Sequence, residues 1–568
     1  MLPLQDGWFE WISPEATAGS PYRFQIDDKI EVPDPASRFQ PQDVHGPSEV
    51  VDSGAFQWSD EAWRGRPWEE AAIYELHVGT FTPEGTFRGV EQKLDYLQSL
   101  GVTAVELTPV ADFPGTRNWG YDGVLPFAPD SSYGRPEDLK QLVQAAHGKG
   151  LMMFLDVVYN HFGPEGNYLH LFAPQFFTNR HHTPWGDAIN FDGPESRVVR
   201  DFFIHNALYW LEEYNFDGLR LDAVDAIVDK STPNILAELA QTVRERFGTE
   251  RFVHLVVENV ENTARYLGRD QAGNVGLYDA QWNDDIHHCV HVLLTGETDG
   301  YYSDYAPDPM RHLCRCLLEG FAYQGDYSEY HGKNRGEPSG HLPPSAFISF
   351  LQNHDQIGNR AFGERIAQLA DPRALKAAME ILLLAPPPPL IFMGEEFGAS
   401  TPFFFFTDFH GDLAAAVTNG RRSEFARFAK YNSPEARESI PDPNAESTYL
   451  QSKLSWDSLQ EKVHADWLKL YRDLLAIRQS KVVPHLGRTC ATRCEVSKSK
   501  ERKLSVDWIF DGGARLELRA NLGSETVLIS EELRTTPFYA SNPEAAAAFE
   551  HGSLPPWSVV WCLHDQDQ

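Results

Sequence analysis

The chain has 568 residues, of which 42% are hydrophobic, and its 49 basic and 82 acidic residues give a formal net charge of -33. A chain of this length is too long for one ordinary hydrophobic core, so we expect two or three domains. The large negative charge argues against nucleic acid or an anionic membrane surface as a partner.

The start of the chain and its cysteine content predict a cellular location. The first six residues have neither the basic region nor the apolar core of a signal peptide, and no apolar stretch is long enough to cross a bilayer. Six cysteines in a chain of this size are too few for a disulfide scaffold. We therefore expect a protein of the reducing cytoplasm.

Residues 1–60 are predicted to be extended and rich in turns. Proline at positions 33, 35 and 41 would interrupt any helix in this stretch. Aromatic residues such as Trp11, Tyr22 and Phe24 are enough for a few short strands but too few for an independent β-sandwich. We interpret the stretch as the remnant of an N-terminal β-sandwich domain and a linker, with most of that domain missing.

Residues 61–484 alternate between strand and helix patterns, which predicts a parallel sheet covered by helices. A helix is predicted at 136–147, for example, because the apolar residues at 139, 142, 143 and 146 share one face. Further helices are predicted at 198–214, 233–247 and 463–477. Strands are predicted at 73–81, 103–109, 151–156, 216–222, 251–258, 274–282, 347–355 and 389–395. Eight such units predict an α/β fold of the closed (β/α)8, or TIM barrel, type.

Two other segments depart from this alternation. An insertion at about 162–196 is rich in His, Pro, Phe and Gly and shows no period, and a long irregular excursion inside a repeating fold is usually functional. Residues 485–568 contain short alternating strands at 504–510, 514–521 and 558–563. They predict a small C-terminal antiparallel β domain.

The stretch from 216 to 225 contains two charged residues in an otherwise apolar strand. Residues two apart on a strand share a face, so Arg220 and Asp222 should project to one side. A guanidinium beside a buried carboxylate offsets the cost of desolvation and keeps the carboxylate ionised. The pair could be a structural ion pair, or it could hold a charged nucleophile in a dry pocket.

Three other apolar runs also lead to a carboxylate, at Asp156, Glu258 and Asp355. Acids at the carboxyl ends of parallel barrel strands lie where barrel enzymes place their chemistry. Glycoside hydrolysis needs such acids: Asp222 would be the nucleophile, Glu258 the general acid with a pKa raised by desolvation, and Asp355 the group that stabilises the transition state. No cofactor or metal is implied.

Four ordered segments, at 156–161, 218–222, 258 and 350–355, resemble those of the α-amylase family of glycoside hydrolases. The resemblance implies a retaining mechanism with the three carboxylates in these roles. It also implies that His161, His354 and Arg220 contact the sugar or the nucleophile, and that Tyr121 stacks under the cleaved glucose, although Tyr121 could be plain core. Asp156 and the neighbouring Asn160 are expected to brace loops.

Within this family, segments at 33–41, 44–48, 278–288, 293–297, 354–360 and 394–397 resemble the malto-oligosyltrehalose trehalohydrolases. The resemblance implies hydrolysis of the α-1,4 bond next to a terminal trehalose, and a functional pairing with a synthase that makes the substrate. The residues expected to bind substrate are Tyr121, Asp122, His161, Trp185, Arg220, Asp225, Asn283, Asp284, His287, His354, Gln356 and Asn359.

Other functions remain open at this point. A glucan branching or debranching enzyme would share the same acids and differ in how it handles the acceptor. A catalytically silent barrel that binds glucan or a partner protein is disfavoured because all three carboxylates are present. His287, His288, Cys289 and His291 form a tempting metal cluster, but packing or substrate contact is the more common use of such residues.

Overall fold

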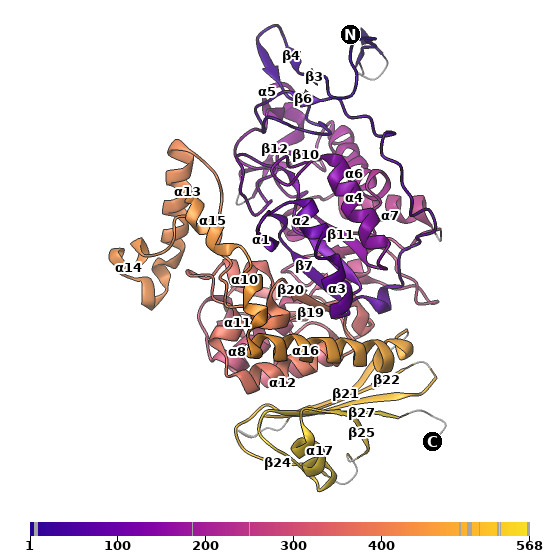
Figure 1. Ribbon diagram of the computed structural model, residues 1–568, viewed down its shortest axis with the longest axis vertical. Coiled ribbons are helices and arrows are strands. Elements are labelled where there is room, and N and C mark those ends of the chain that lie inside the picture. Colours follow the sequence, from indigo (N-terminus) through magenta and orange to yellow (C-terminus); the bar gives the residue numbers. More distant parts are fainter. Residues whose placement is uncertain are drawn as a thin grey trace.

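In the computed structural model, eight parallel strands form a closed barrel at the centre of the molecule (Figure 1). The structure describes residues 1–4, 9–183, 186–248, 250–487, 490–496, 502–510, 512–530, 533 and 535–564. In their order around the barrel, the strands are β7 (Ile73–Leu76), β8 (Ala104–Leu107), β11 (Met152–Val157), β14 (Gly218–Leu221), β15 (His254–Val257), β16 (Ala280–Trp282), β19 (Phe347–Phe350) and β20 (Pro389–Phe392). Because the spatial order follows the sequence order, the predicted (β/α)8 barrel is confirmed.

Helices cover the outside of the barrel. They are α2 (Phe87–Glu91), α3 (Leu94–Leu100), α4 (Pro136–His147), α6 (Ser196–Glu213), α7 (Ile235–Phe247), α8 (Asp284–Thr295), α9 (Pro309–Glu319), α12 (Pro372–Leu384) and α16 (Lys462–Ile477). Helix α4 has the predicted bounds, with proline in its first turn and the predicted apolar face buried. The connection between β15 and β16 has only a 3-10 turn, Ala264–Leu267.

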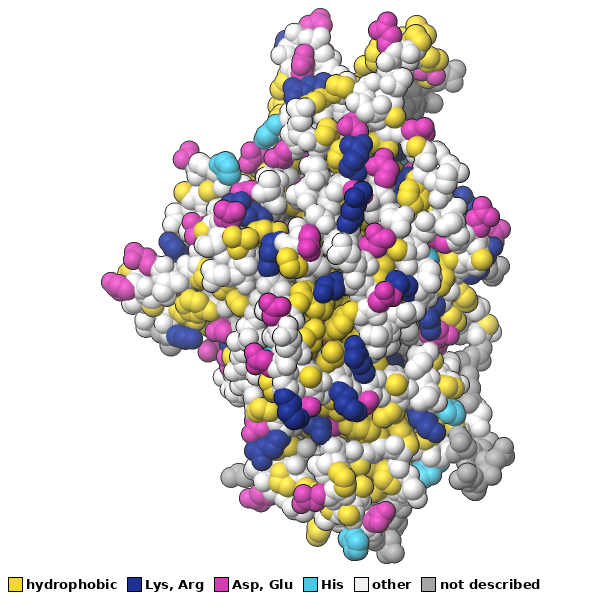
Figure 2. Space-filling model, in the orientation of Figure 1, with side chains coloured by type: hydrophobic (Ala, Val, Ile, Leu, Met, Phe, Trp, Pro, Cys, Tyr) yellow, Lys and Arg dark blue, Asp and Glu magenta, His cyan; other side chains and the backbone are white. Residues whose placement is uncertain are grey.

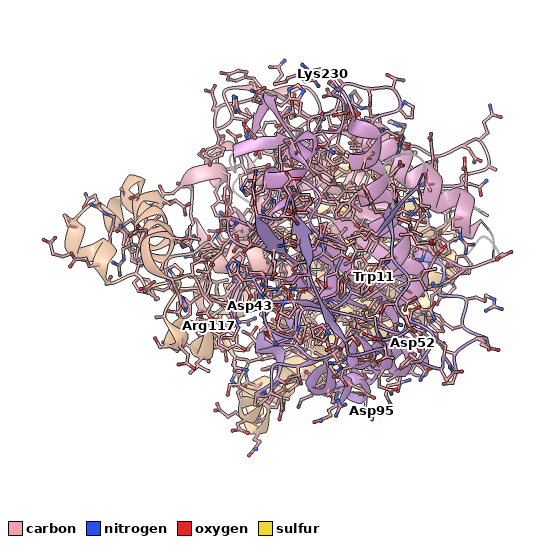
Figure 3. All side chains as sticks on the ribbon, turned by 90° about the horizontal axis from the view of Figure 1, so that it is seen from above. Trp11, Asp43, Asp52, Asp95, Arg117 and Lys230 are labelled. Carbon is pink, nitrogen blue, oxygen red and sulfur yellow. A yellow bond between two sulfur atoms is a disulfide. The ribbon has the colours of Figure 1, made fainter. Side chains whose placement is uncertain are left out.

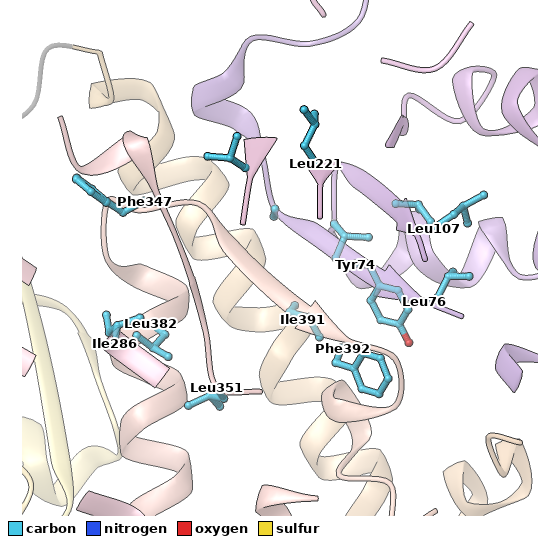
Figure 4. Close-up of a cluster of buried hydrophobic side chains, with 14 of the residues drawn as sticks. Tyr74, Leu76, Leu107, Leu221, Ile286, Phe347, Leu351, Leu382, Ile391 and Phe392 are labelled. Carbon is cyan, nitrogen blue, oxygen red and sulfur yellow. The ribbon is translucent and has the colours of Figure 1, made fainter. Parts of the chain in front are cut away.

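The two faces of the barrel strands pack into different cores. Outward-facing residues such as Leu76, Leu107 and Leu221 belong to the large cluster shared with the helices (Figure 4). Inward-facing residues form a separate cluster of Trp68, Ala71, Ile73, Ala104, Met152, Phe154, Val256, Ala280, Trp282, Ile348, Phe350 and Leu390. Strand side chains alternate, so the inward positions nearer the carboxyl ends hold Glu75, Glu106, Asp156 and Arg220. The barrel interior thus has an apolar floor with a charged layer above it.

All the predicted barrel strands except that at 151–156 are shorter in the structure, and local contacts explain the shortening of the first and the sixth. The first ends at Leu76 because a short helix, α1 (Val78–Phe81), follows, and the His77 imidazole bonds with the Thr80 hydroxyl in its first turn. The sixth begins only at Ala280, because Asn274 lies in a turn in which its backbone N–H donates to the Asp270 carboxylate. Local side-chain bonds therefore compete with the strand pattern at both places.

Two excursions extend from the barrel. The predicted insertion after β11 contains α5 (Leu169–Phe172) and an antiparallel hairpin of β12 (Phe177–Thr183) and β13 (Gly186–Ile189). A second excursion after β20 was not predicted. It contains α13 (Gly411–Glu424), α14 (Pro434–Glu438) and α15 (Glu446–Ser452), and α13 and α14 project from one side of the molecule in two perpendicular views (Figures 1 and 3). Short helices α10 (His354–Gly358) and α11 (Ile366–Leu369) follow β19.

The C-terminal part is an antiparallel sheet, as predicted. Its order is β21 (Cys490–Val496), β22 (Lys503–Ile509), β23 (Arg515–Asn521), β27 (Ser558–His564) and β25 (Pro537–Ala540). Beside it lie α17 (Pro543–Glu550) and the pair β24 (Val527–Leu528) and β26 (Ser553–Leu554). A disulfide between Cys314 and Cys494 joins α9 to β21. No local pattern indicated it, because the two cysteines are 180 residues apart.

The described residues of the N-terminal part form short strand pairs. They are β1 (Leu2–Pro3) with β2 (Phe9–Glu10), β3 (Pro21–Tyr22) with β6 (Ser48–Glu49), and β4 (Phe24–Ile26) with β5 (Ile30–Val32).

Two short antiparallel pairs lie in connections of the barrel. The hairpin of β17 (Asp326–Ser328) and β18 (Lys333–Arg335) lies before β19, and the pair β9 (Ala111–Asp112) and β10 (Leu125–Pro129) follows β8. The domain boundaries at residues 60 and 484 stay a prediction.

The surface is mixed in charge. On the face shown in Figure 2, Lys and Arg side chains are interspersed with Asp and Glu, so the negative charge is not gathered into one patch there. Among the helices in the described ranges, none has the length and apolar character needed to span a membrane.

Candidate active site

Arg220 brings the acids of neighbouring strands together. Its side chain is fully buried, and its Nη1 donates to Asp156 Oδ2 (2.6 Å) and to Asp222 Oδ1 (2.9 Å). Its Nη2 lies 2.8 Å from Glu258 Oε2, an ion contact whose angle is too poor for a hydrogen bond. The guanidinium also lies over the Trp282 ring. Asp222 and Glu258 therefore contact one cation and lie on the same side of the barrel.

The backbone and a neighbouring amide fix the two carboxylates further. Asn160 Nδ2 donates to the side chain and to the backbone carbonyl of Asp222, both at 2.8 Å. The backbone N–H of Ala223 donates to Glu258 Oε2 at 2.9 Å. The Tyr121 hydroxyl donates to Asp156 Oδ2 at 2.7 Å. Asp156 and Asn160 thus support the groups around Asp222, as the sequence led us to expect.

Burial sets the proton affinity of Glu258. Desolvation raises its pKa above the ordinary value, the adjacent Arg220 lowers it, and the neighbouring Asp222 raises it again, with a net increase. A carboxyl group with a raised pKa keeps its proton at a pH where an exposed one would lose it. Glu258 therefore has the electrostatic surroundings of a general acid.

The third carboxylate, Asp355, lies at the start of α10 next to a charged histidine. His354 Nδ1 bonds with Glu75 Oε1 (2.5 Å), and its Nε2 lies 3.5 Å from Asp355 Oδ1. Burial alone would lower the pKa of His354, but Asp355 and Glu75 raise it to about 9. The imidazolium is therefore positive at neutral pH. The ring of Tyr121 stacks on it, with centroids 5.1 Å apart.

A cleft of about 160 Å³ opens beside two of the three acids. Glu258, Asp355 and three predicted residues, Asp284, Gln356 and Asn359, line it. Gln356 donates to Asp284 (3.3 Å) and Asn359 to Asp355 (3.4 Å). His288, from the histidine cluster noted in the sequence, also lines it. The rest of the lining was not predicted: Val260, Tyr301, Asp304, Tyr305, Tyr330, His331 and Arg335. Most of these lie in the long connection between β16 and β19, where the pairs Tyr301-Tyr302 and Tyr330-His331 were the only signal.

Two further predicted residues lie on the other side of the acids. His161 is buried, and its imidazole bonds with the backbone carbonyl of Tyr121 (2.9 Å) and with Asn160. Asp122 accepts a hydrogen bond from the Asn118 amide. His161 also borders a hollow of about 800 Å³ along the first excursion, between α5 and the β12–β13 hairpin. This hollow shares no lining residue with the 160 Å³ cleft.

Three further predicted substrate contacts in the described part of the chain do not line the cleft. Asn283 is buried and donates to the Gly320 carbonyl (2.8 Å). His287 is buried and bonds with the Leu351 carbonyl (2.6 Å) and the Tyr302 hydroxyl (3.0 Å), so both residues support the fold rather than face the cleft. Asp225 is exposed at the edge of a different hollow. Trp185 lies outside the described residues.

The histidine cluster packs against aromatic rings. His291 stacks on Tyr302, with centroids 4.2 Å apart, and His288 packs on Tyr301 and Tyr305. In the described parts of the chain, no three His, Cys, Asp or Glu side chains are grouped so that they could hold a metal ion. The cluster therefore shapes the aromatic wall of the cleft.

The second excursion supports the turn that follows Asp355. Arg421 of α13 is buried, and its Nη2 donates to the carbonyl oxygens of Gly358 (2.5 Å) and Arg360 (3.1 Å). On the opposite side the turn packs on Trp119, whose ring would lie 2.0 Å from a Cβ added at Gly358. The turn holds Asn359 in the cleft wall, so α13 helps to fix the position of Asn359.

We expect the Arg421→Ala variant to bind substrate less well. The loss of the hydrogen bonds from this buried charged donor, including one at 3.4 Å to Asn359 Oδ1 itself, should lower kcat/KM about 10- to 100-fold, with most of the effect on KM, because the acids themselves stay in place. Steady-state kinetics on the substrate proposed below would measure this. Arg422→Ala is the matched control, since the hydrogen bonds of Arg422 within the described residues go to the Glu438 and Ile440 carbonyls, both at 3.4 Å. Equal effects of both variants would show that Arg421 has no special role.

Comparison with known proteins decides the family. The alpha-amylase catalytic domain family matches residues 37–206, and a domain family of unknown function, DUF3459, matches residues 493–561. The malto-oligosyltrehalose trehalohydrolase of Deinococcus radiodurans is 43% identical over 94% of this chain and 85% of its own length. That of Saccharolobus solfataricus is 43% identical over 88% of this chain and 82% of its own length. The chain belongs to the malto-oligosyltrehalose trehalohydrolases of the α-amylase family.

A solved structure supports the same fold. A crystal structure from Salmonella typhimurium, described provisionally as an alpha amylase, is 46% identical, with a TM-score of 0.92 over 99% of this chain and 93% of that one. A 1,4-alpha-glucan branching enzyme of Pseudoalteromonas atlantica is 32% identical, but over only 41% of this chain and 37% of its own length. The similarity to trehalohydrolases thus extends over the whole barrel and beyond, whereas that to the branching enzyme is partial.

Proposed function

We propose that this protein hydrolyses the α-1,4-glucosidic bond next to the terminal trehalose of a malto-oligosyltrehalose and releases trehalose and a malto-oligosaccharide. The contact of Asp222 and Glu258 with the single Arg220 guanidinium supports the proposal most strongly, because two carboxylates held by one cation are near enough to act on one sugar. Membership of the trehalohydrolase family specifies the bond.

The reaction proceeds in two steps with retention of configuration. Asp222 attacks the anomeric carbon, the bond from that carbon to the leaving oxygen breaks, and Glu258 gives its proton to that oxygen, which departs with trehalose. A covalent bond then joins the glucosyl carbon to Asp222. Water attacks the same carbon, Glu258 takes a proton from it, and Asp222 leaves as a carboxylate. Asp355, beside the His354 imidazolium, stabilises the positive charge of both transition states.

The trehalosyl end is assigned to the 160 Å³ cleft, since Glu258 lies in its wall and must reach the leaving oxygen. Asp284, Gln356 and Asn359 supply polar groups for sugar hydroxyls, and Tyr301 and Tyr330 supply faces for the sugar rings. Tyr121, Asp122 and His161 border the glucosyl side. The remaining sequence-based contacts, Asp225 above all, stay predictions.

One defined substrate tests this function. With maltotriosyl-trehalose, we expect free trehalose and maltotriose in equal amounts, and proton NMR of the first turnovers should show the new reducing end as the α anomer. The Asp222→Asn protein is the control for contaminating activity. A branching or debranching enzyme would release no trehalose, and a branching enzyme would change the iodine staining of amylose. Either of those outcomes would reject the proposal.

The proposal includes two points of cellular context. Because the substrate ends in a trehalose unit that this reaction cannot make, a synthase that forms it must act first. The cytoplasm is the proposed location for both enzymes, because six cysteines in a chain of this size, with one disulfide among the described residues, are too few for the disulfide scaffold of a small secreted domain.

A further inference from the structure

Glu106 is a buried acid that the mechanism above does not use. It projects into the barrel from β8, and only 1% of the residue is exposed. Neither of its carboxyl oxygens has a hydrogen-bond donor among the described residues. A fully ionised carboxylate in such a place would bear the whole cost of desolvation without any hydrogen bond. Its surroundings must therefore explain how it is tolerated.

The neighbours of Glu106 are other charged groups of the barrel interior. Glu75 is its direct partner on the adjacent parallel strand β7, so the two side chains leave the sheet at the same level. Asp156 on β11, Arg220 on β14 and His354 on α10 also act on it electrostatically. Glu75 bonds with His354 through one oxygen, and its other oxygen, Oε2, is buried with no donor either in the described parts of the chain. The adjacent carboxyl groups of Glu75 and Glu106 thus both have buried oxygens without a hydrogen-bond donor in the described residues.

We propose that Glu106 is a neutral carboxylic acid whose O–H donates to Glu75 Oε2, and that it acts as a positioning residue for Asp355. A single proton would satisfy the unmatched oxygen of Glu75 and remove the charge from Glu106. The resulting series of side-chain contacts runs from Glu106 to Glu75, from Glu75 to His354, and from His354 to Asp355. Burial and the nearby Glu75 and Asp156 raise the pKa of Glu106 well above its usual range, which agrees with a retained proton.

The role of this series of contacts is to hold His354 in place. The imidazolium has one nitrogen on Glu75 and the other 3.5 Å from Asp355, so its orientation depends on how firmly Glu75 is fixed. With Glu106 as donor, Glu75 is bonded on both oxygens and cannot rotate away. The positioning role of Glu106 rests on the function proposed above for Asp355. The protonation state of Glu106 does not depend on that function.

Two substitutions distinguish a neutral donor from a charged acid. Glu106→Gln keeps the shape, the neutral state and an N–H donor, so we expect kcat within about threefold of the unsubstituted protein. Glu106→Leu removes the donor, and we expect kcat to fall about 10- to 100-fold, with little change in KM. If Glu106 were charged, the Gln variant would be as impaired as the Leu variant, and the proposal would be wrong. If the Leu variant does not fold, the kcat of the Gln variant alone tests the proposal: a value within about threefold supports it, and a larger loss contradicts it.

A spectroscopic measurement decides the protonation state without any substrate. The infrared difference spectrum between the unsubstituted protein and Glu106→Gln at neutral pH should show the C=O band of one protonated carboxyl group, with a shift in D2O. A carboxylate band in its place would overturn the proposal. Glu380→Gln is the matched control for kinetics: Glu380 is buried too, but the Tyr539 and Ser541 hydroxyls of the C-terminal part already donate to it. It should leave kcat unchanged.

Discussion

Replacement of Asp222 by asparagine is expected to lower kcat at least about 10⁴-fold while the protein stays folded. An amide cannot form the glycosyl intermediate, and the loss of a covalent nucleophile costs roughly this factor in enzymes where it has been dissected. The fold should survive because the new amide could still bond with Asn160 and leave Arg220 paired with Asp156 and Glu258. Release of trehalose from maltotriosyl-trehalose is the measurement.

Asp156 provides a comparison for this experiment. It pairs with the same guanidinium, but the proposed mechanism gives it no contact with the sugar. Asp156→Asn should therefore retain far more activity than Asp222→Asn. If the two variants were equally inactive, loss of the Arg220 network rather than of a nucleophile would explain the result. Appreciable turnover by Asp222→Asn would contradict the assignment of Asp222 as the nucleophile.

Replacement of Glu258 by glutamine should lower kcat roughly 10²- to 10⁴-fold and should also remove the alkaline limb of the pH profile. The direction of this pH dependence follows from the role of Glu258. The acid must hold a proton in the first step, so activity is lost as pH rises through the pKa of Glu258. That pKa is raised, chiefly by burial, so the loss should begin at higher pH than for an exposed glutamate.

The dependence on the leaving group separates this role from simple structural damage. A glucosyl fluoride needs no protonation to lose fluoride, so the first step with this substrate should be far less affected by Glu258→Gln than the first step with maltotriosyl-trehalose. Added azide, which needs no general base, should restore the second step. Equal losses with both substrates, or an unchanged alkaline limb, would contradict the assignment.

The parts of the fold that follow a hydrophobic period could be predicted from the sequence. The helix at Pro136–His147 and the barrel strands each bury a regular set of apolar residues, so the local sequence pattern is enough to predict where they lie. Errors came where a polar side chain overrides the period, as His77 does at the end of β7. The α13–α15 excursion was missed because α13 buries little besides Arg421, so its helix has no clear apolar face.

The candidate site divides in the same way. The acids at 222, 258 and 355 could be located because each ends an apolar run, and parallel strands bring such ends together. The aromatic part of the cleft wall could not be predicted, since Tyr301, Tyr330 and the nearby Arg335 come from a connection whose path no local pattern defines. His287 and Asn283 were predicted to contact substrate from the resemblance to the family. In the structure both side chains bond with backbone carbonyls, and the adjacent His288 lines the cleft.

Trapping of the covalent intermediate tests the central claim most directly. A fluorinated glucosyl fluoride that reacts quickly in the first step and slowly in the second should accumulate as a glycosyl-enzyme, and peptide mass spectrometry would locate the sugar. We predict one label, on Asp222. A label on Glu258 or Asp355, or efficient turnover in which no labelled enzyme ever accumulates and the product forms with inverted configuration, would contradict the account.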